Sequence, residues 1–88
     1  MKKIPQGIYS ATEAQAVIQA EMNEAHDRYG EYASPIEAAG VMHEEMTEVW
    51  AEIHGNCPMM ARREALQLAA VCIRFATSTT TREDKGQL

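Results

Sequence analysis

Residues 34–55 (SPIEAAGVMHEEMTEVWAEIHG) constrain the fold more than any other stretch, because they carry the start and stop signals of one long helix. Ser34 is a favourable N-cap, Pro35 suits the first helical position, and Glu37 completes a Ser-x-x-Glu capping box. Gly55, preceded by a histidine in the last turn, marks the end. The pattern predicts about 20 helical residues, or roughly 30 Å of helix.

At about 100° per residue, this predicted helix has two unlike faces. Glu44 and Glu48 are i,i+4 neighbours, and Glu45 lies beside Glu48 at i+3. Like charges at these spacings repel one another, and no lysine or arginine lies among them. The acidic face is therefore either a solvated surface or a site for a divalent cation, which takes clustered carboxylate oxygens. The other face is an apolar stripe suited to packing: Ala39, Met42, Met46, Val49, Trp50 and Ile53.

Composition limits the class of protein. The chain has 88 residues, which is the length of one domain, and a formal net charge of −5, which disfavours a nucleic acid polymer as a partner unless metal mediates the contact. It shows no signal segment and no apolar run long enough for a membrane. Cys57 and Cys72 form no CxxC pair, so we expect free thiols in a cytoplasmic protein.

Two further helices are predicted on either side of the central one. Ser10 caps the first, Glu13 completes a second capping box, and the helix runs to about Tyr29 before Gly30 stops it. The last helix spans residues 59–77 and follows an Asn-Cys-Pro turn. The absence of strand-like alternation makes the expected fold class all-α.

The last helix also predicts self-association. Its residues 65–76 are apolar almost all the way round, which indicates burial on several sides. Two amphipathic helices of so short a chain cannot cover such a surface. We therefore expect residues 1–77 to form one three-helix domain whose helices assemble into a four-helix-bundle core across a homo-oligomer, a dimer or a dimer of dimers. Residues 78–88 have no periodicity and are expected to be a disordered tail.

A narrow polar stripe interrupts the last helix. Glu64, Gln67 and Arg74 fall within one arc of roughly 80°. Polar groups on a buried helix need partners or a ligand, so the stripe is either a structural network or part of a site. An antiparallel hairpin would bring Glu48 and Glu64 to the same level. The clustered carboxylates and amide would then suit magnesium or manganese, whereas zinc prefers cysteine and histidine.

The combined pattern resembles a known family. The pattern E-E-x-x-E at residues 44–48, followed by E-x-x-Q at residues 64–67, is similar to the E-E-x-x-E…E-x-x-D signature of the MazG-like branch of the all-α NTP pyrophosphatases. The flanking text (YASP before the helix and QLAA after the second motif) is also similar, and the resemblance covers roughly residues 26–76. Gln67 stands in place of the aspartate; its carbonyl oxygen can coordinate a cation but brings no charge.

The resemblance implies an activity and its residues. It implies a Mg²⁺-dependent enzyme, with Mn²⁺ as a possible substitute, that hydrolyses (deoxy)nucleoside triphosphates to a monophosphate and pyrophosphate. By position, the resemblance implies that Glu44, Glu45, Glu48 and Glu64 are catalytic and bind the metal with Gln67, and that one of these glutamates serves as the general base. The rival hypothesis is a helical oligomerisation or binding module that has the fold without the chemistry.

Four other residues are weaker candidates for substrate binding. Arg62 and Arg74 could meet phosphates, and Asn23 and His26 on the first helix could line a base pocket. A surface or packing role is the alternative for each of them. A carboxylate-bridged di-iron bundle is excluded, since the chain has no Glu-x-x-His motif.

Overall fold

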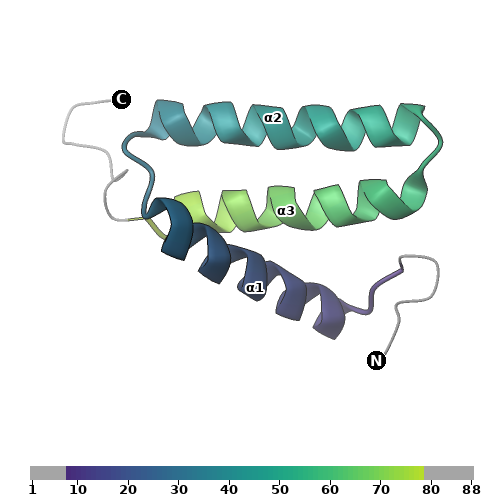
Figure 1. Ribbon diagram of the computed structural model, residues 1–88, viewed down its shortest axis with the longest axis horizontal. Coiled ribbons are helices and arrows are strands. Elements are labelled where there is room, and N and C mark those ends of the chain that lie inside the picture. The colour runs from purple at the N-terminus through teal and green to yellow at the C-terminus, as the bar shows by residue number, and fades with distance from the viewer. Residues whose placement is uncertain (1–7, 79–88) are drawn as a thin grey trace.

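The structure is a computed structural model that describes residues 8–78, and it consists of three helices (Figure 1). They are α1 (Ala11–Tyr29), α2 (Pro35–His54) and α3 (Pro58–Ala76), and no strand occurs among the described residues. The predicted all-α class and the three helices are confirmed, with α3 displaced by one residue from its predicted bounds. The predicted tail, except for Ser78, lies outside the described residues. No described helix is both long and apolar enough to cross a membrane.

The helices α2 and α3 form an antiparallel hairpin, and α1 crosses α3 at an angle (Figure 1). Within the described part of the chain, α3 packs against both other helices, whereas α1 and α2 make no close backbone approach to each other. The last helix is therefore the centre of the fold, as its nearly uniform apolar sequence suggests. No helix of residues 8–78 packs on the outer face of the hairpin, away from α1.

Local capping explains where the first two helices begin. At α1 both halves of the capping box form: the Ser10 hydroxyl accepts from the Glu13 N–H, and the Glu13 carboxylate accepts from the Ser10 N–H. At α2 the Ser34 hydroxyl accepts from the Glu37 N–H at 3.2 Å. The Glu37 carboxylate, however, binds the N–H of Ala33 at 2.5 Å, one residue before the cap. The capping box predicted for Ser34 and Glu37 is thus only half formed.

A residue with positive φ lies in each of the two connections between helices. Gly30 ends α1 with φ 72°, and its N–H donates to the His26 carbonyl at 2.8 Å. Asn56 follows α2 with φ 62°, a conformation that asparagine adopts more readily than most residues. The next N–H, of Cys57, donates to the Glu52 carbonyl at 2.8 Å and so satisfies the last turn of α2. This short turn brings α3 back along α2.

The core lies between α2, α3 and the loop that follows α1. Tyr32, Ala38 and Val71 are buried together, and Val41, Met42 and Phe75 pack partly buried against them. Val49, Ala61 and Ala70 are also buried, but no residue of α1 is. The predicted stripe on α1 is thus only partly covered, which makes α1 the least firmly packed helix of the described chain.

The predicted apolar stripe on α2 divides into a buried part and an exposed part. Val49 is buried and Met42 is partly buried. Met46, Trp50 and Ile53 remain 51%, 60% and 58% exposed. The described chain alone therefore leaves a substantial apolar surface in contact with water.

Candidate functional site

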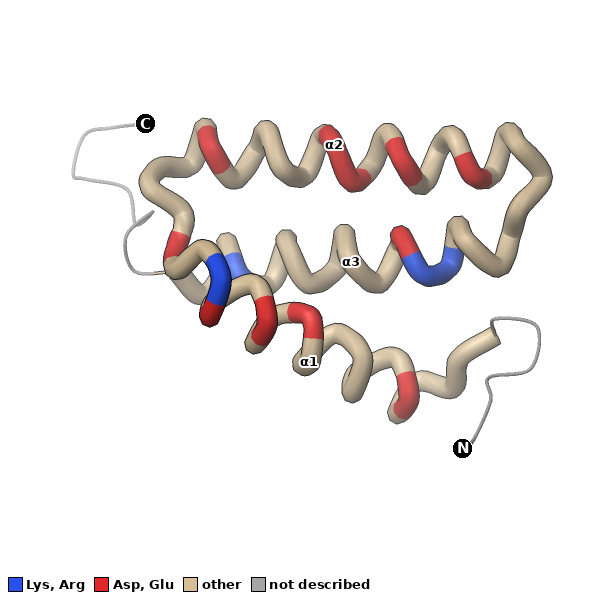
Figure 2. The backbone as a smooth tube through the Cα atoms, viewed as in Figure 1, with Lys and Arg blue, Asp and Glu red and all other residues tan. Residues whose placement is uncertain are grey.

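The hairpin brings together three glutamates, Glu45 and Glu48 of α2 and Glu64 of α3. One carboxylate oxygen from each lies within 4.8 Å of the other two. The expectation that an antiparallel hairpin would bring Glu48 and Glu64 to the same level is confirmed. Acidic positions are spread along α2, whereas α3 carries a single one, which lies beside α2 (Figure 2). We call Glu45, Glu48 and Glu64 the acidic triad.

Burial and mutual repulsion perturb two members of the acidic triad, Glu45 and Glu64. The Oε1 atoms of Glu45 and Glu64 are buried and have no hydrogen-bond partner. Burial, followed by the hydrogen bond and charge of Glu48 and the charge of Glu45, raises the pKa of Glu64 from 4.5 to about 7. Burial, followed by the charges of Glu48 and Glu44, also raises the pKa of Glu45. Oxygen-only ligands of this kind suit a hard cation such as Mg²⁺ or Mn²⁺, whose charge would offset the repulsion.

The structure places Glu44 and Gln67 differently from the acidic triad. Glu44 is exposed, and it lines a hollow of about 340 Å³ that it shares with Glu45, Tyr32 and Arg74. Gln67 is half-buried and lines a pocket that it shares with Glu45. Of the five residues of the sequence motif, three thus form the compact acidic triad, and Glu44 and Gln67 lie at its edges.

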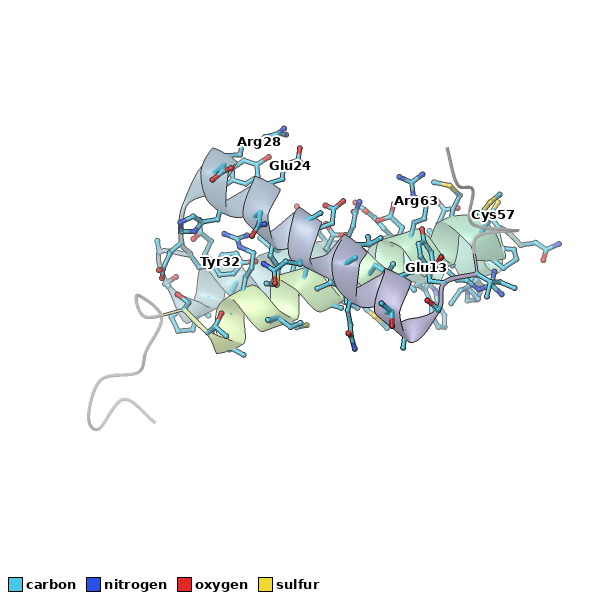
Figure 3. All side chains as sticks on the ribbon, turned by 90° about the horizontal axis from the view of Figure 1, so that it is seen from below. Glu13, Glu24, Arg28, Tyr32, Cys57 and Arg63 are labelled. Atoms are coloured by element: carbon cyan, nitrogen blue, oxygen red, sulfur yellow. The ribbon has the colours of Figure 1, made fainter. Side chains whose placement is uncertain are left out.

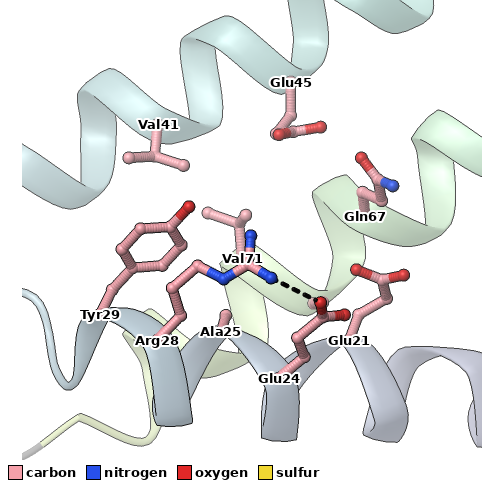
Figure 4. A pocket seen from close by; sticks show the side chains of 10 residues that line it. Glu21, Glu24, Ala25, Arg28, Tyr29, Val41, Glu45, Gln67 and Val71 are labelled. Carbon is pink, nitrogen blue, oxygen red and sulfur yellow. Dashed lines mark hydrogen bonds and ion pairs between the residues drawn. The ribbon is translucent and has the colours of Figure 1, made fainter.

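A pocket of about 380 Å³ adjoins the acidic triad through Glu45 (Figure 4). All three helices contribute to it, and α1 supplies half of its lining. The sequence led us to expect Asn23 and His26 of α1 in a base pocket, but which α1 residues line this pocket depends on the angle at which α1 crosses α3. We call this space the three-helix pocket, and it is lined by Glu21, Glu24, Ala25, Arg28, Tyr29, Val41, Glu45, Gln67, Ala70 and Val71.

One wall of the three-helix pocket is an ion pair. The Arg28 guanidinium donates to the Glu24 carboxylate at 3.0 Å, one turn apart on α1, and the two side chains lie together at the same end of that helix (Figure 3). The same guanidinium lies 5.9 Å from the centroid of the Tyr29 ring. Both charged side chains are more than 60% exposed, so the pair adds little stability.

Of the four weaker candidates, Asn23, His26 and Arg62 line hollows that contain no member of the acidic triad, whereas Arg74 shares a hollow with Glu45. Asn23 and His26 line a second hollow of about 180 Å³. Asn23 also accepts a hydrogen bond from Gln19 at 2.9 Å. Arg62 is exposed at the start of α3 and borders an apolar hollow near the hairpin turn. None of these three residues lines the three-helix pocket.

Arg74 has a structural role. Its guanidinium donates to the Gly30 carbonyl and, at 3.4 Å, to the Tyr32 hydroxyl. It also lies 4.6 Å from the centroid of the Tyr32 ring, within the range of a cation–π contact. Arg74 thus links the loop after α1 to the end of α3 by hydrogen bonds. At Arg74, the polar stripe of α3 is part of a structural hydrogen-bond network.

Comparison with known proteins adds no identification. No protein-family model, no curated protein and no solved structure matches this chain. The functional argument therefore rests on the motif in the sequence and on the geometry of the acidic triad and the three-helix pocket.

Proposed function

We propose that the protein is a MazG-like nucleoside triphosphate pyrophosphohydrolase that depends on Mg²⁺. The observation that carries the proposal is the convergence of Glu45, Glu48 and Glu64 from two helices, with two buried carboxylate oxygens that have no partner. Such oxygens are costly to bury without a proton or a cation. The motif in the sequence and the neighbouring pocket support the same function.

The donor set fits a hard divalent cation. Glu45, Glu48 and Glu64 would hold it, with Glu44 and Gln67 at the edges of the site. When bound, Mg²⁺ supplies charge neutralisation for the phosphates and a more acidic water. The proposed reaction adds water at the α-phosphorus and breaks the bond to the bridging oxygen of the β-phosphate. The products are a nucleoside monophosphate and pyrophosphate.

We further propose that the protein is a homodimer whose α2 and α3 helices form a four-helix core. On α2 the exposed apolar residues recur at spacings of three, seven, four and three, which keeps them on one face of the helix, as in a helix–helix seam. On α3 the small residues Ala65, Cys72 and Ala76 are exposed and would permit close approach of another helix. The exposed members on α2 are Ile36, Ala39, Met46, Trp50 and Ile53.

The two apolar faces adjoin one another. A hollow of about 460 Å³ is lined by Val49 and Ile53 from α2 together with Ala61 and Ala65 from α3. The apolar face is therefore continuous across the hairpin, on one side of a chain too short to bury it alone. A second copy presents the same face, so two copies can cover both surfaces in an isologous contact.

The second candidate function is a helical oligomerisation module without catalysis. The exposed apolar face favours it, as does Gln67, since an amide replaces the charged ligand of the family signature.

We propose the same cellular location for both candidates. Cys57 and Cys72 are free thiols exposed on the chain, and we place the protein in the reducing cytoplasm.

One assay separates the two functions. Purified protein is incubated with a panel of ribo- and deoxyribonucleoside triphosphates in Mg²⁺ or Mn²⁺, and pyrophosphate is measured. The expected result is metal-dependent release that the variant Glu48→Gln abolishes. Asp27→Asn is the matched control, because Asp27 is an exposed carboxylate of α1 outside the triad and the pocket. Release of no pyrophosphate from any nucleotide would reject the enzyme and favour the module.

A further inference from the structure

The three-helix pocket contains a carboxylate that has no partner. Glu21 of α1 is half-buried, and its carboxylate makes no hydrogen bond or ion pair to any described residue. Its side chain points toward Gln67, on the side of the pocket nearest Glu45 (Figure 4). The neighbouring Glu24 differs, because it is paired with Arg28. Glu21 is therefore the carboxylate of α1 in this pocket that is available to a ligand, whereas the unpartnered oxygen of Glu45 belongs to the acidic triad.

The remaining lining suits a flat ring. Ala25, Val41 and Val71 provide apolar contacts, and Figure 4 shows Val41 on α2 above Tyr29, with Ala25 and Val71 nearer the middle of the pocket. A volume of about 380 Å³ is in the range of small-molecule sites. Because Glu45 belongs to both the pocket and the acidic triad, a nucleotide whose phosphates lie at the triad can reach this pocket with its base. The hollow of about 340 Å³ is also lined by Glu45, but it does not contain Glu21.

The chemistry of a carboxylate selects among bases. An ionised carboxylate only accepts hydrogen bonds, and its two oxygens can accept two parallel N–H donors. Guanine presents such a pair, the ring N1–H and the 2-amino group. Adenine and cytosine place one amino group beside a ring acceptor. Uracil and thymine place carbonyl oxygens on both sides of their N–H, and these would repel the carboxylate.

We propose, resting on the proposed function, that the three-helix pocket binds the base of guanosine or deoxyguanosine triphosphate. Glu21 accepts from N1–H and from the 2-amino group and sets the base preference. Inosine triphosphate isolates this contact, because its base keeps N1–H and lacks only the 2-amino group. A hydrogen bond to a charged group corresponds to a preference of about 10-fold or more.

Binding is tested by calorimetry in Mg²⁺ with uncleavable α,β-methylene analogues of the guanosine, inosine and uridine triphosphates. The wild-type protein is expected to bind the guanosine analogue about 10-fold more tightly than the inosine analogue. Glu21→Gln should reduce this ratio to below about threefold, since an amide offers one acceptor oxygen where the carboxylate offers two. Asp27→Asn, with the same change of charge on α1, should retain it. Circular dichroism confirms that each variant is folded.

The outcomes separate this inference from the function on which it rests. Equal affinity of the wild-type protein for the guanosine and inosine analogues overturns the inference, and this comparison needs no variant. An unchanged ratio in folded Glu21→Gln also overturns it. Pyrophosphate release without base preference supports the enzyme and rejects the role of Glu21. Preferential binding of the guanosine analogue without release from any triphosphate supports the role of Glu21 and rejects the enzyme.

Discussion

Replacing Glu64 with glutamine should stabilise the metal-free protein at alkaline pH and have a much smaller effect at acidic pH. In the folded chain, burial and the neighbouring Glu48 and Glu45 raise the pKa of Glu64 from 4.5 to about 7. Between these two pH values, the folded state keeps a proton that the unfolded state has released. The free energy of unfolding therefore falls as pH rises through this window. Glutamine does not ionise, so the variant lacks this loss.

The magnitude follows from the size of the shift. A change from 4.5 to about 7 corresponds to about 3 kcal/mol at 1.36 kcal/mol per unit. The carboxyl group is only partly buried, so solvent screening reduces the expected effect to about 1 kcal/mol. In a domain of this size, about 1 kcal/mol shifts the melting temperature by about 4–8 °C.

The assay is thermal unfolding followed by circular dichroism at pH 5 and pH 8, with a chelator and a fixed protein concentration. Glu64→Gln should melt about 4–8 °C above the wild type at pH 8 and close to it at pH 5. Asp27→Asn removes an exposed carboxylate outside the acidic triad and should show no such pH dependence. Equal melting temperatures of Glu64→Gln and wild type at pH 8 would show that the triad carboxylates do not repel one another in the folded state.

Three other variants test the fold and the assembly. Arg74→Ala removes the contacts to Gly30 and Tyr32 and should cost about 1–2 kcal/mol in urea unfolding, whereas exposed Arg63→Ala should cost less than about 0.5; equal costs would contradict the structural role. Ser10→Ala should cost about 1 kcal/mol and speed amide exchange in α1; unchanged exchange would show the cap to be unimportant. Trp50→Asp should convert the proposed dimer to monomers in sedimentation; a wild-type mass of one chain would refute the dimer.

The helices and their bounds followed from local sequence, because caps, glycines and prolines act within one or two turns. The N-cap of Ser10, the stop at Gly30 and the start at Ser34 needed no tertiary information, and all three are found. The pairing of Glu48 with Glu64 also followed, since a short turn between two long helices leaves an antiparallel hairpin as the simple arrangement.

Tertiary structure decided what each helix face meets. The angle at which α1 crosses α3 placed Glu21 beside Gln67, and no periodicity in the sequence encodes that angle. The loop conformation after α1 brought Gly30 and Tyr32 to Arg74, and no pattern in the sequence predicted these contacts. Hydrophobic spacing identifies an apolar stripe, but only the packed chain shows which part of that stripe its own helices cover.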